Sequence, residues 1–496
     1  MESGDTRTVV QLLAAQGYNI EPAAAKELSA VDNIPDAIDR TIDSLSGNPL
    51  IIRTADLPDD LHATGHPDPP TSSETTAEEG TISVSSPHET KGSTQSIAVS
   101  NDITGHSTGT GEYRDFVSLF RDRYDRLSNE IRGRVSHRSA RSLEAARGGG
   151  ESGIIGMIND IRSTKNGHWL IELEDTTGTY PILIMRESEL APYVDELVTD
   201  EVIGVEGRVS DDGGIIFAES LHFPDIPRTN SPNRADRPVE AALISDVHVG
   251  SKEFLEDAWD NFTSWLRTPE AELIEYLVIA GDMVEGVGVY PGQDADLVEV
   301  DIYDQYERFS EKLKQVPGDI QIIMIPGNHD AVRLAEPQPM LDDEFMSLFD
   351  SHDITATSNP STITIESVKI LVYHGASLDE IIAQVPDAYG TYEKPHLAMQ
   401  TLLKKRHLAP PFGGMIRIAP EKRDYLVIDE IPDVFHAGHV HTVGVGTYNG
   451  ITIVNSGCWQ SQTDFQQRNN LDPDPGIAPI LDLQTLDITL RRFATS

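Results

Sequence analysis

Cysteine is almost absent from this chain of 496 residues, which contains a single one, Cys458. One cysteine cannot form an internal disulfide bond, and it cannot build a thiolate-rich zinc or iron–sulfur site. A bound metal ion would therefore have to be held by histidine, aspartate, asparagine or glutamate side chains.

Long apolar runs are missing as well. No stretch of about 18 apolar residues, the length needed to cross a bilayer, occurs in the chain. The first ten residues are polar and acidic, without the basic-then-apolar pattern of a secretory signal. We therefore expect a cytoplasmic protein.

Positive charge is scarce: 38 lysine and arginine residues face 81 aspartate and glutamate residues, which gives a net charge of -43. Such a charge could mean that the protein avoids nucleic acid, because like charges repel. The acidic residues run through every segment, however, which favours adaptation to very high salt. Screening is strong there, with a Debye length of about 3 Å at 1 M salt. The net charge therefore says little about partners.

A chain of this length is too long for one compact core, so we expect several folded units and linkers. Residues 1–50 show helical spacing of apolar residues and predict a small helical module. Residues 51–112 are rich in Ser, Thr, Gly, Pro and acid, which predicts a disordered acidic linker. The remaining predictions are a helical connector at 113–150, a β-barrel at 151–225, a linker at 226–239 and an α/β domain at 240–496.

The segment 151–225 reads as three strands, a short helix and two more strands. This order is typical of a five-stranded OB-fold barrel. Such barrels bind single-stranded nucleic acid or oligosaccharides, or serve as spacers between proteins. Trp169 and Tyr180 could stack on nucleobases, but an aromatic residue in a strand more often belongs to the core.

The strongest functional signal in the sequence is a series of ligand-type side chains, each of which follows an apolar strand. They are Asp246, His248, Asp282, Asn328, His329, His374, His439 and His441. In an α/β sheet, the carboxyl ends of the strands form the edge at which ligands bind. Aspartate, asparagine and histidine suit manganese, iron, zinc or nickel. Two such ions about 3.5–4 Å apart can hold a phosphate diester for in-line attack.

Taken alone, each of these residues has an ordinary explanation. An aspartate at a strand end is usually a turn residue or a helix cap, and a histidine in a loop is usually idle. Five such clusters in succession make coincidence improbable. His436 lies within the last strand and is expected to be structural, and His352, His396 and His407 are expected to be non-ligands.

The ordered motifs of residues 240–460 resemble those of the calcineurin-like metallophosphoesterase superfamily. They are Asp246-Val247-His248, Gly281-Asp282-Met283-Val284-Glu285-Gly286, Pro326-Gly327-Asn328-His329-Asp330, His374-Gly375 and Gly438-His439-Val440-His441. Finer motifs resemble the small subunits of archaeal family D DNA polymerases. These are Tyr373-His374-Gly375 with Leu378-Asp379, Arg406-His407-Leu408-Ala409-Pro410, Ile418-Ala419-Pro420-Glu421, Asn455-Ser456-Gly457-Cys458-Trp459-Gln460 and Gln462-Thr463-Asp464-Phe465-Gln466. This resemblance covers residue 150 to the end well and the first 150 residues loosely.

The resemblance implies a metallophosphoesterase sandwich at 240–496 with 3′–5′ exonuclease activity that proofreads for a separate large polymerase subunit. Its substrate would be a DNA 3′ end, single-stranded or in a primer–template. Two divalent ions are implied, with manganese preferred. By motif, Asp246, His248, Asp282 and His441 would hold one ion. Asp282, Asn328, His374 and His439 would hold the other, and His329 would act as the acid near the leaving 3′ oxygen.

Two alternatives remain open at this point. In the first, the subunit is a scaffold whose cleavage activity is vestigial. In the second, the chain is a stand-alone phosphatase or phosphodiesterase. The intact ligand set argues against the scaffold, and the preceding barrel argues against the stand-alone enzyme.

Overall fold

The computed structural model divides the chain into two compact units, residues 1–91 and 92–496. The structure describes residues 97–145, 150–349, 353–385 and 392–494 of the second unit, and in the first unit residues 9, 19–20, 22–29, 31, 33–44, 51–52 and 57–58. His352, expected to be a non-ligand, lies outside the described residues. None of the described helices is both long and apolar enough to cross a membrane.

In the first unit, two helices and a pair of short strands surround a small core. The helices are α2 (Pro22–Ser29) and α3 (Ile34–Ser44), and β1 (Asn19–Ile20) pairs in parallel with β2 (Ile51–Ile52). Ala25, Leu28 and Ile38 are among the buried residues of this core. The helical spacing of the sequence thus corresponds to helices here, whereas the strand pair was not predicted.

The prediction of a disordered linker at 51–112 is wrong for residues 97–112. Residues 59–96 lie outside the described residues, but β3 (Ala98–Ser100) pairs antiparallel with β13 (Ser361–Ile365). Ile103 behind it is fully buried, and the backbone N–H of Gly109 donates to the Glu421 carboxylate at 2.8 Å. We call residues 97–112 the strap. Composition alone did not predict its structure, because its partners lie more than 200 residues further along the chain.

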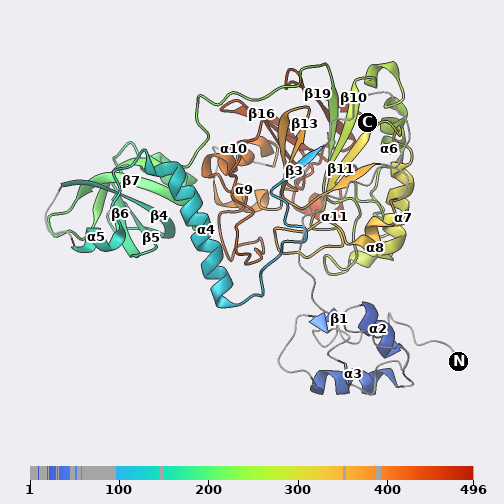
Figure 1. The fold of residues 1–496 in the computed structure, drawn as a ribbon, viewed down its shortest axis with the longest axis horizontal. Helices are drawn as coiled ribbons and strands as arrows, with labels where there is room; N and C mark the ends of the chain where they lie inside the picture. The colour runs from blue at the N-terminus through green and yellow to red at the C-terminus, as the bar shows by residue number, and fades with distance from the viewer. Residues whose placement is uncertain are drawn as a thin grey trace, which may run out of the picture. The chain divides into compact units, whose positions relative to one another are not determined.

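Two helices and a closed barrel follow, in the order that the sequence predicts. The helices are α4 (Tyr113–Arg132) and α5 (Ala140–Ala145). The barrel strands are β4 (Gly150–Ser163), β5 (Trp169–Asp175), β6 (Gly178–Ile184), β7 (Val202–Val209) and β8 (Ile216–His222), with the 3-10 helix η3 (Ala191–Glu196) between β6 and β7. They close in the order β4-β5-β6-β8-β7, and α4 lies beside them in Figure 1.

The two aromatic residues considered for base stacking differ in their burial. Tyr180 is 1% exposed inside the barrel, and its hydroxyl donates to the carbonyl of Gly213 at 2.7 Å. Trp169 is partly buried against the same core. Tyr180 therefore belongs to the packed interior and is not a stacking platform.

The rest of the chain forms two six-stranded sheets. The first has the order β12-β11-β10-β9-β18-β19 and the second β16-β17-β15-β14-β13-β3. The strands of the first sheet are β9 (Glu240–Ile244), β10 (Ile274–Ala280), β11 (Gln321–Ile325), β12 (Ile354–Ala356), β18 (Ile477–Asp482) and β19 (Ile488–Arg492). Those of the second, besides β13 and β3, are β14 (Val368–Val372), β15 (Val434–Ala437), β16 (Val443–Tyr448) and β17 (Ile451–Ser456).

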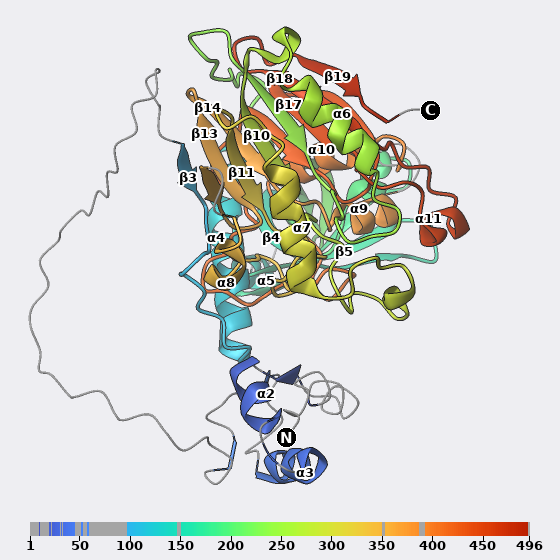
Figure 2. The same cartoon turned by 90° about the vertical axis from the view of Figure 1, so that its right-hand side faces the viewer.

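The two sheets share one core, to which Leu243 and Val278 contribute from the first sheet and Ile370 and Val454 from the second. Helices α6 (Glu256–Trp265), α7 (Ile302–Leu313) and α8 (Asp343–Met346) pack on the outer side of the first sheet, and Figure 2 shows α6 and α7 lying across it. Helices α9 (Leu378–Gln384) and α10 (Pro395–Lys405) cover the second sheet. The predicted α/β class is confirmed.

The central strands explain why the ligand-type residues can meet. β9, β10 and β11 are mutually parallel, as are β14 and β15, so within each sheet these strands end at one edge. These strands are apolar and almost fully buried, which is typical of parallel strands covered on both faces. The polar residues that follow them are thereby carried to a common edge.

Candidate metal centre

The predicted site residues follow the strands that lead into this edge. Asp246 and His248 come after β9, Asp282 after β10, Asn328 and His329 after β11, His374 after β14, and His439 and His441 after β15. Among the described residues, three groups offer ligand atoms within 4.8 Å of one another. They are Asp246 with His248 and His441, His248 with Asp282 and His329, and Asp282 with His374 and His439.

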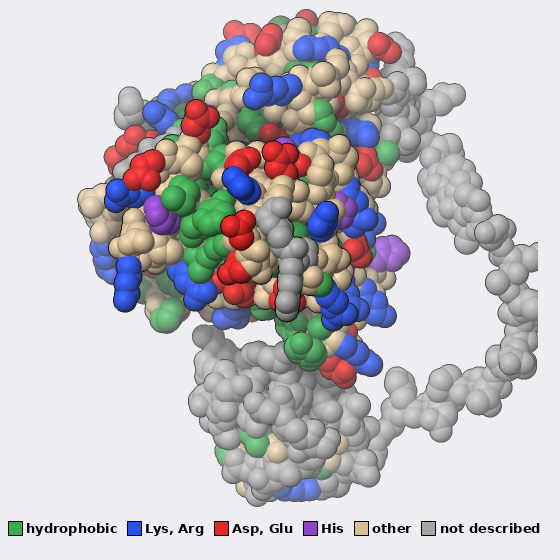
Figure 3. Space-filling view, turned by 90° about the vertical axis from the view of Figure 1, so that its left-hand side faces the viewer, with side chains coloured by type: hydrophobic (Ala, Val, Ile, Leu, Met, Phe, Trp, Pro, Cys, Tyr) green, Lys and Arg blue, Asp and Glu red, His purple; other side chains and the backbone are tan. Residues whose placement is uncertain are grey.

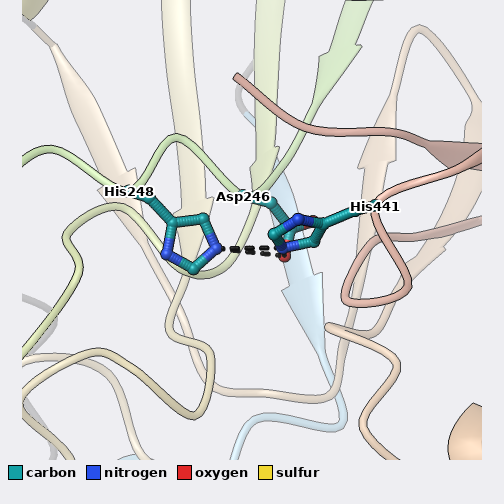
Figure 4. A group of neighbouring side chains, drawn as sticks. All are labelled: Asp246, His248 and His441. Atoms are coloured by element: carbon teal, nitrogen blue, oxygen red, sulfur yellow. Dashed lines mark hydrogen bonds and ion pairs between the residues drawn. The ribbon is translucent and has the colours of Figure 1, made fainter. Parts of the chain in front are cut away.

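The first group fits a cation. Nε2 of His248 lies 3.1 Å from Nε2 of His441, and the two rings face each other beside Asp246 in Figure 4. Oδ1 of Asp246 lies 3.5 Å from the His441 Nε2 and has no hydrogen-bond partner among the described residues, although it is buried. A buried carboxylate oxygen without a donor is costly, and a cation between these atoms would satisfy it.

The third group, Asp282 with His374 and His439, shares the edge with Asn328. Nε2 of His374 lies 3.2 Å from Oδ2 of Asp282 and 3.0 Å from Oδ1 of Asn328. The other ring nitrogen, Nδ1, donates to the carbonyl of Ala280 at 2.8 Å. This bond fixes the tautomer and leaves Nε2 directed at the two oxygens, as in metal-binding histidines.

Asp282 and His248 each belong to two of the three groups, and Asp282 is the carboxylate that is shared in this way. Its Oδ1 accepts the backbone N–H of His329 at 2.8 Å, while its Oδ2 faces His374. Burial would raise the pKa of Asp282, but the charges of His374 and His329 hold this pKa well below its usual range. Burial would likewise lower the pKa of His374, yet Asp282 raises it to about 10. The Asp282 carboxylate and the His374 imidazole thus each favour the charged form of the other.

The backbone around these residues is strained. Asp246, His248, Asp282, His439 and His441 all have positive φ values, between 51° and 72°. Left-handed backbone at non-glycine residues costs on the order of 1–3 kcal/mol each and clusters at functional sites. Gly327 and Gly438 permit the close approach, because a Cβ at either position would collide with the carboxylates of Asp282 and Asp246.

Three acidic residues support the site and were not singled out in the sequence. Glu285 Oε2 lies 2.9 Å from Nδ1 of His248, and Asp379 Oδ2 lies 3.1 Å from Nε2 of His439. Asp330 accepts the backbone N–H groups of Gly327 and Met283. All three lie within the motifs quoted above, but only their long-range contacts reveal what they touch.

The other histidines stand apart from these groups. His436 is buried in β15 beside Ser456, and burial lowers its pKa to about 3. His407 pairs with Asp424 at 2.9 Å. His396 lies near the beginning of α10. Among the described residues none of the three joins a group that could hold an ion.

His329 faces a cavity of about 710 Å³ that adjoins the metal centre. Its Nδ1 donates to the carbonyl of Glu285 at 2.7 Å, which fixes the ring. His248, Asp282, His439 and His441 line the same cavity. A substrate in this space would therefore touch both the predicted ligands and His329.

Comparison with known proteins gives the family. Residues 241–443 match the family model for the B-type subunits of DNA polymerases alpha and epsilon. A relative from Halobacterium salinarum, a DNA polymerase II small subunit, is 52% identical over 98% of this chain and 98% of its own length. The protein of the same name from Archaeoglobus fulgidus is 40% identical over 95% of each chain.

A solved archaeal phosphodiesterase aligns with 51% of this chain and 99% of its own, at 12% identity and a TM-score of 0.24. That score is too low to carry an argument about the fold. The sequence relatives are sufficient by themselves, because their identity extends over almost the whole chain. The chain belongs to the family of DNA polymerase II small subunits, the small subunits of the archaeal family D DNA polymerases.

Proposed function

We propose that this small subunit is a 3′–5′ exonuclease that removes nucleotides from a DNA 3′ end by a two-metal mechanism. The observation that carries the proposal is the convergence of the eight predicted residues on one edge: seven lie in the ligand groups, in which Asp282 is the shared carboxylate, and Asn328 contacts His374. Such a shared carboxylate is what a pair of neighbouring ions requires.

The chemistry of the side chains supports a division into two ligand sets. Asp246, His248, Asp282 and His441 would hold one ion, and Asp282, Asn328, His374 and His439 the other. When bound, two such ions stabilise the charge of a phosphodiester under in-line attack. Manganese is the preferred ion, and iron, zinc or nickel would also suit these ligands.

His329 is the proposed general acid. It follows Asn328 directly and lines the cavity, and its Nδ1 is already engaged by the carbonyl of Glu285. Nε2 is therefore the atom that delivers a proton when the ring is in its cationic form, and burial of the ring lowers the pKa of His329, which makes that cation a stronger acid. The leaving group would be the 3′ oxygen of the penultimate nucleotide, which becomes the new DNA end.

The wider architecture belongs to the same proposal. The closed barrel at 151–225 is an OB fold, and the two sheets at 240–496 are a metallophosphoesterase sandwich. The segments 1–50, 113–150 and 226–239 act as a module and connectors, and residues 97–112 form a strap that docks on the sandwich. The partner is the large polymerase subunit, which we place on the barrel and the adjoining face of the sandwich.

A scaffold role explains less of what is observed. A scaffold does not need a buried carboxylate oxygen without a donor, or five left-handed residues at one edge. Both features cost stability, and both are accounted for if the edge binds cations. A stand-alone phosphodiesterase would not need the barrel.

The proposal is tested with the full chain in high salt with manganese, alone and together with the large subunit. The substrate is a primer–template with a 3′ mismatch, and loss of 3′ nucleotides is followed on a gel. We expect the wild type to shorten the primer and His329→Ala to do so roughly 10²–10⁴-fold more slowly. His396→Ala is the matched control and should match the wild type. No metal-dependent shortening by the wild type, in either form, would refute the exonuclease.

A further inference from the structure

Two large apolar side chains line the cavity beside the metal centre and remain exposed. Phe465 is 68% exposed and Met415 is 65% exposed. His439 and His441 line the same cavity. A concave site that combines apolar walls with a few convergent polar groups is the usual form of a ligand site. These two side chains therefore suit a ligand with an apolar face.

Phe465 is held in a fixed place relative to the predicted ligands. It lies in α11 (Asp464–Arg468), whose N-cap Thr463 and third residue Gln466 exchange hydrogen bonds in a capping box. Nε2 of Gln466 also lies 2.9 Å from Nδ1 of His441. The short helix is thus tied to a residue of the metal centre, and its phenylalanine is positioned in advance.

Met415 is anchored in a comparable way from another part of the chain. The backbone N–H groups of Met415 and Ile416 bond to the carboxylate of Glu380. Glu380 lies in α9, which begins four residues after His374. Gly414 permits the close approach, because a Cβ there would collide with the Glu380 carboxylate. Both apolar side chains are therefore attached to segments that carry predicted ligands.

The charges of the cavity leave little attraction for a DNA backbone. Apart from the histidines, its charged lining residues are Lys252, Glu253, Asp282, Glu285, Asp296, Asp379 and Asp464. The single lysine donates to the carbonyl of Ala295. Stacking of a base on an aromatic ring does not depend on sequence and needs no net charge. It also persists at high salt, where contacts between exposed charges are screened.

We propose that Phe465, with Met415 beside the same cavity, is the platform on which the unpaired 3′-terminal nucleobase stacks. This inference rests on the proposed exonuclease and names how that site recognises its substrate. A base within a duplex is already stacked between its neighbours and paired, so its faces are covered. A frayed or mismatched terminal base has a free face. The platform thereby favours unpaired ends whatever their sequence.

The test measures binding, so that it does not depend on cleavage. The full chain, with calcium in place of manganese, is titrated onto single-stranded oligonucleotides that end in 2-aminopurine or in an abasic site. Quenching of the 2-aminopurine reports stacking, and fluorescence anisotropy of a 5′ dye reports affinity for both ends. The variants are Phe465→Ala, Phe465→Leu and Phe465→Trp, with the exposed Tyr113 outside the cavity, as Tyr113→Ala, for control.

We expect Phe465→Ala to weaken binding of the 2-aminopurine end by roughly 10-fold and to abolish its quenching. Phe465→Trp should retain both, Phe465→Leu should lose the quenching, and the abasic end should bind equally to all variants. Quenching that is absent in the wild type or unchanged in Phe465→Ala overturns the inference, as does an equal loss for the abasic end. A wild type that quenches but never cleaves with manganese refutes the exonuclease alone.

Discussion

Two buried clusters of histidine and aspartate in this chain have similar composition and opposite character. In the first, His407 and Asp424 are joined by Arg123 from α4. Nδ1 of His407 accepts the backbone N–H of Ala409 at 3.0 Å, and Nε2 donates to Asp424 at 2.9 Å. The Asp424 carboxylate also accepts from Arg123 at 2.7 Å and from Leu426. Every ring nitrogen and carboxylate oxygen of the His407–Asp424 pair has a partner, and of the polar atoms of Arg123 only Nη2 has none among the described residues.

The candidate metal centre is the second cluster, and polar atoms of its predicted ligands lack partners. Oδ1 of Asp246 has no donor among the described residues, two imidazole nitrogens face each other at 3.1 Å, and the residues that carry these groups have left-handed backbone. Buried polar groups are normally paired, and the exceptions require an explanation. The closed cluster fits a structural role, whereas the open one fits the ions and the substrate of the proposed function.

The largest expected effect is the loss of cleavage when an aspartate is removed from the open cluster. Asp282→Ala should lower cleavage by roughly 10³-fold or more, since it removes a ligand from both ion sites. Its circular dichroism and its unfolding transition should remain those of a folded protein. The measurements are primer shortening and chemical denaturation on the same preparation.

Asp424→Ala should behave in the opposite way. It leaves the buried Arg123 without its carboxylate, which should cost about 3–5 kcal/mol of unfolding free energy. Cleavage per folded molecule should be retained. If Asp282→Ala cleaved normally, or if Asp424→Ala lost activity while fully folded, the two clusters would not have separate roles.

A smaller effect is expected in the pH dependence of the unfolding free energy, to which His407 of the closed cluster contributes. Burial lowers the pKa of His407 to about 4, whereas an unfolded chain protonates histidine near pH 6.5. Between these values the unfolded chain binds more protons, so the free energy of unfolding falls as pH falls. From pH 7 to pH 5 the loss from this group should be about 2 kcal/mol.

The measurement is the difference between wild type and His407→Gln in denaturant unfolding at pH 7 and pH 5. Glutamine keeps a donor for Asp424 and does not titrate. The pKa of Asp424 is held below its usual range, so this carboxylate contributes only at lower pH. Buried Glu336, whose pKa burial raises to about 7, acts with the opposite sign in both proteins and cancels in the difference. Equal pH dependence of the two proteins would show that His407 is not neutral in the fold.

The smallest effect is expected at the surface. Lys369 and Glu430 form an ion pair of 2.7 Å, but their side chains are 37% and 51% exposed. Glu430→Gln should change the unfolding free energy by less than about 1 kcal/mol, and by less still in high salt. Denaturation at low and high salt measures this. A loss of unfolding free energy comparable with that of Asp424→Ala would mean that burial does not decide how much an ion pair contributes to stability.

The strands, and the meeting of the predicted residues at one edge, could be predicted from the sequence because their signals are local. An apolar run that ends in Asp-x-His, or in Gly-Asn-His, predicts a strand and places ligand-type side chains at its carboxyl end. The strap at 97–112 has no such signal, since β3 is a strand only because β13 offers an edge for pairing. The partners of His248 and His439, Glu285 and Asp379, likewise follow from packing. Tyr180 was ambiguous because both faces of a barrel strand accept aromatic residues.

The remaining feature of the sequence is the excess of aspartate and glutamate over lysine and arginine, which concerns the surface. On the face shown in Figure 3, acidic and basic side chains are interspersed around hydrophobic ones. A distribution of this kind agrees with acid used for solvation at high salt, and that adaptation stays a prediction. It is the reason why high salt is specified in the experiments above.

The most direct test of the central claim is a count of the ions that the chain binds. The full chain is stripped with a chelator, dialysed against manganese in high salt and analysed for metal and protein content. The account predicts two ions per wild-type chain, two in His396→Ala and fewer than one in Asp282→Ala. A wild type that binds no ion, or an Asp282→Ala variant that still holds two, would contradict it.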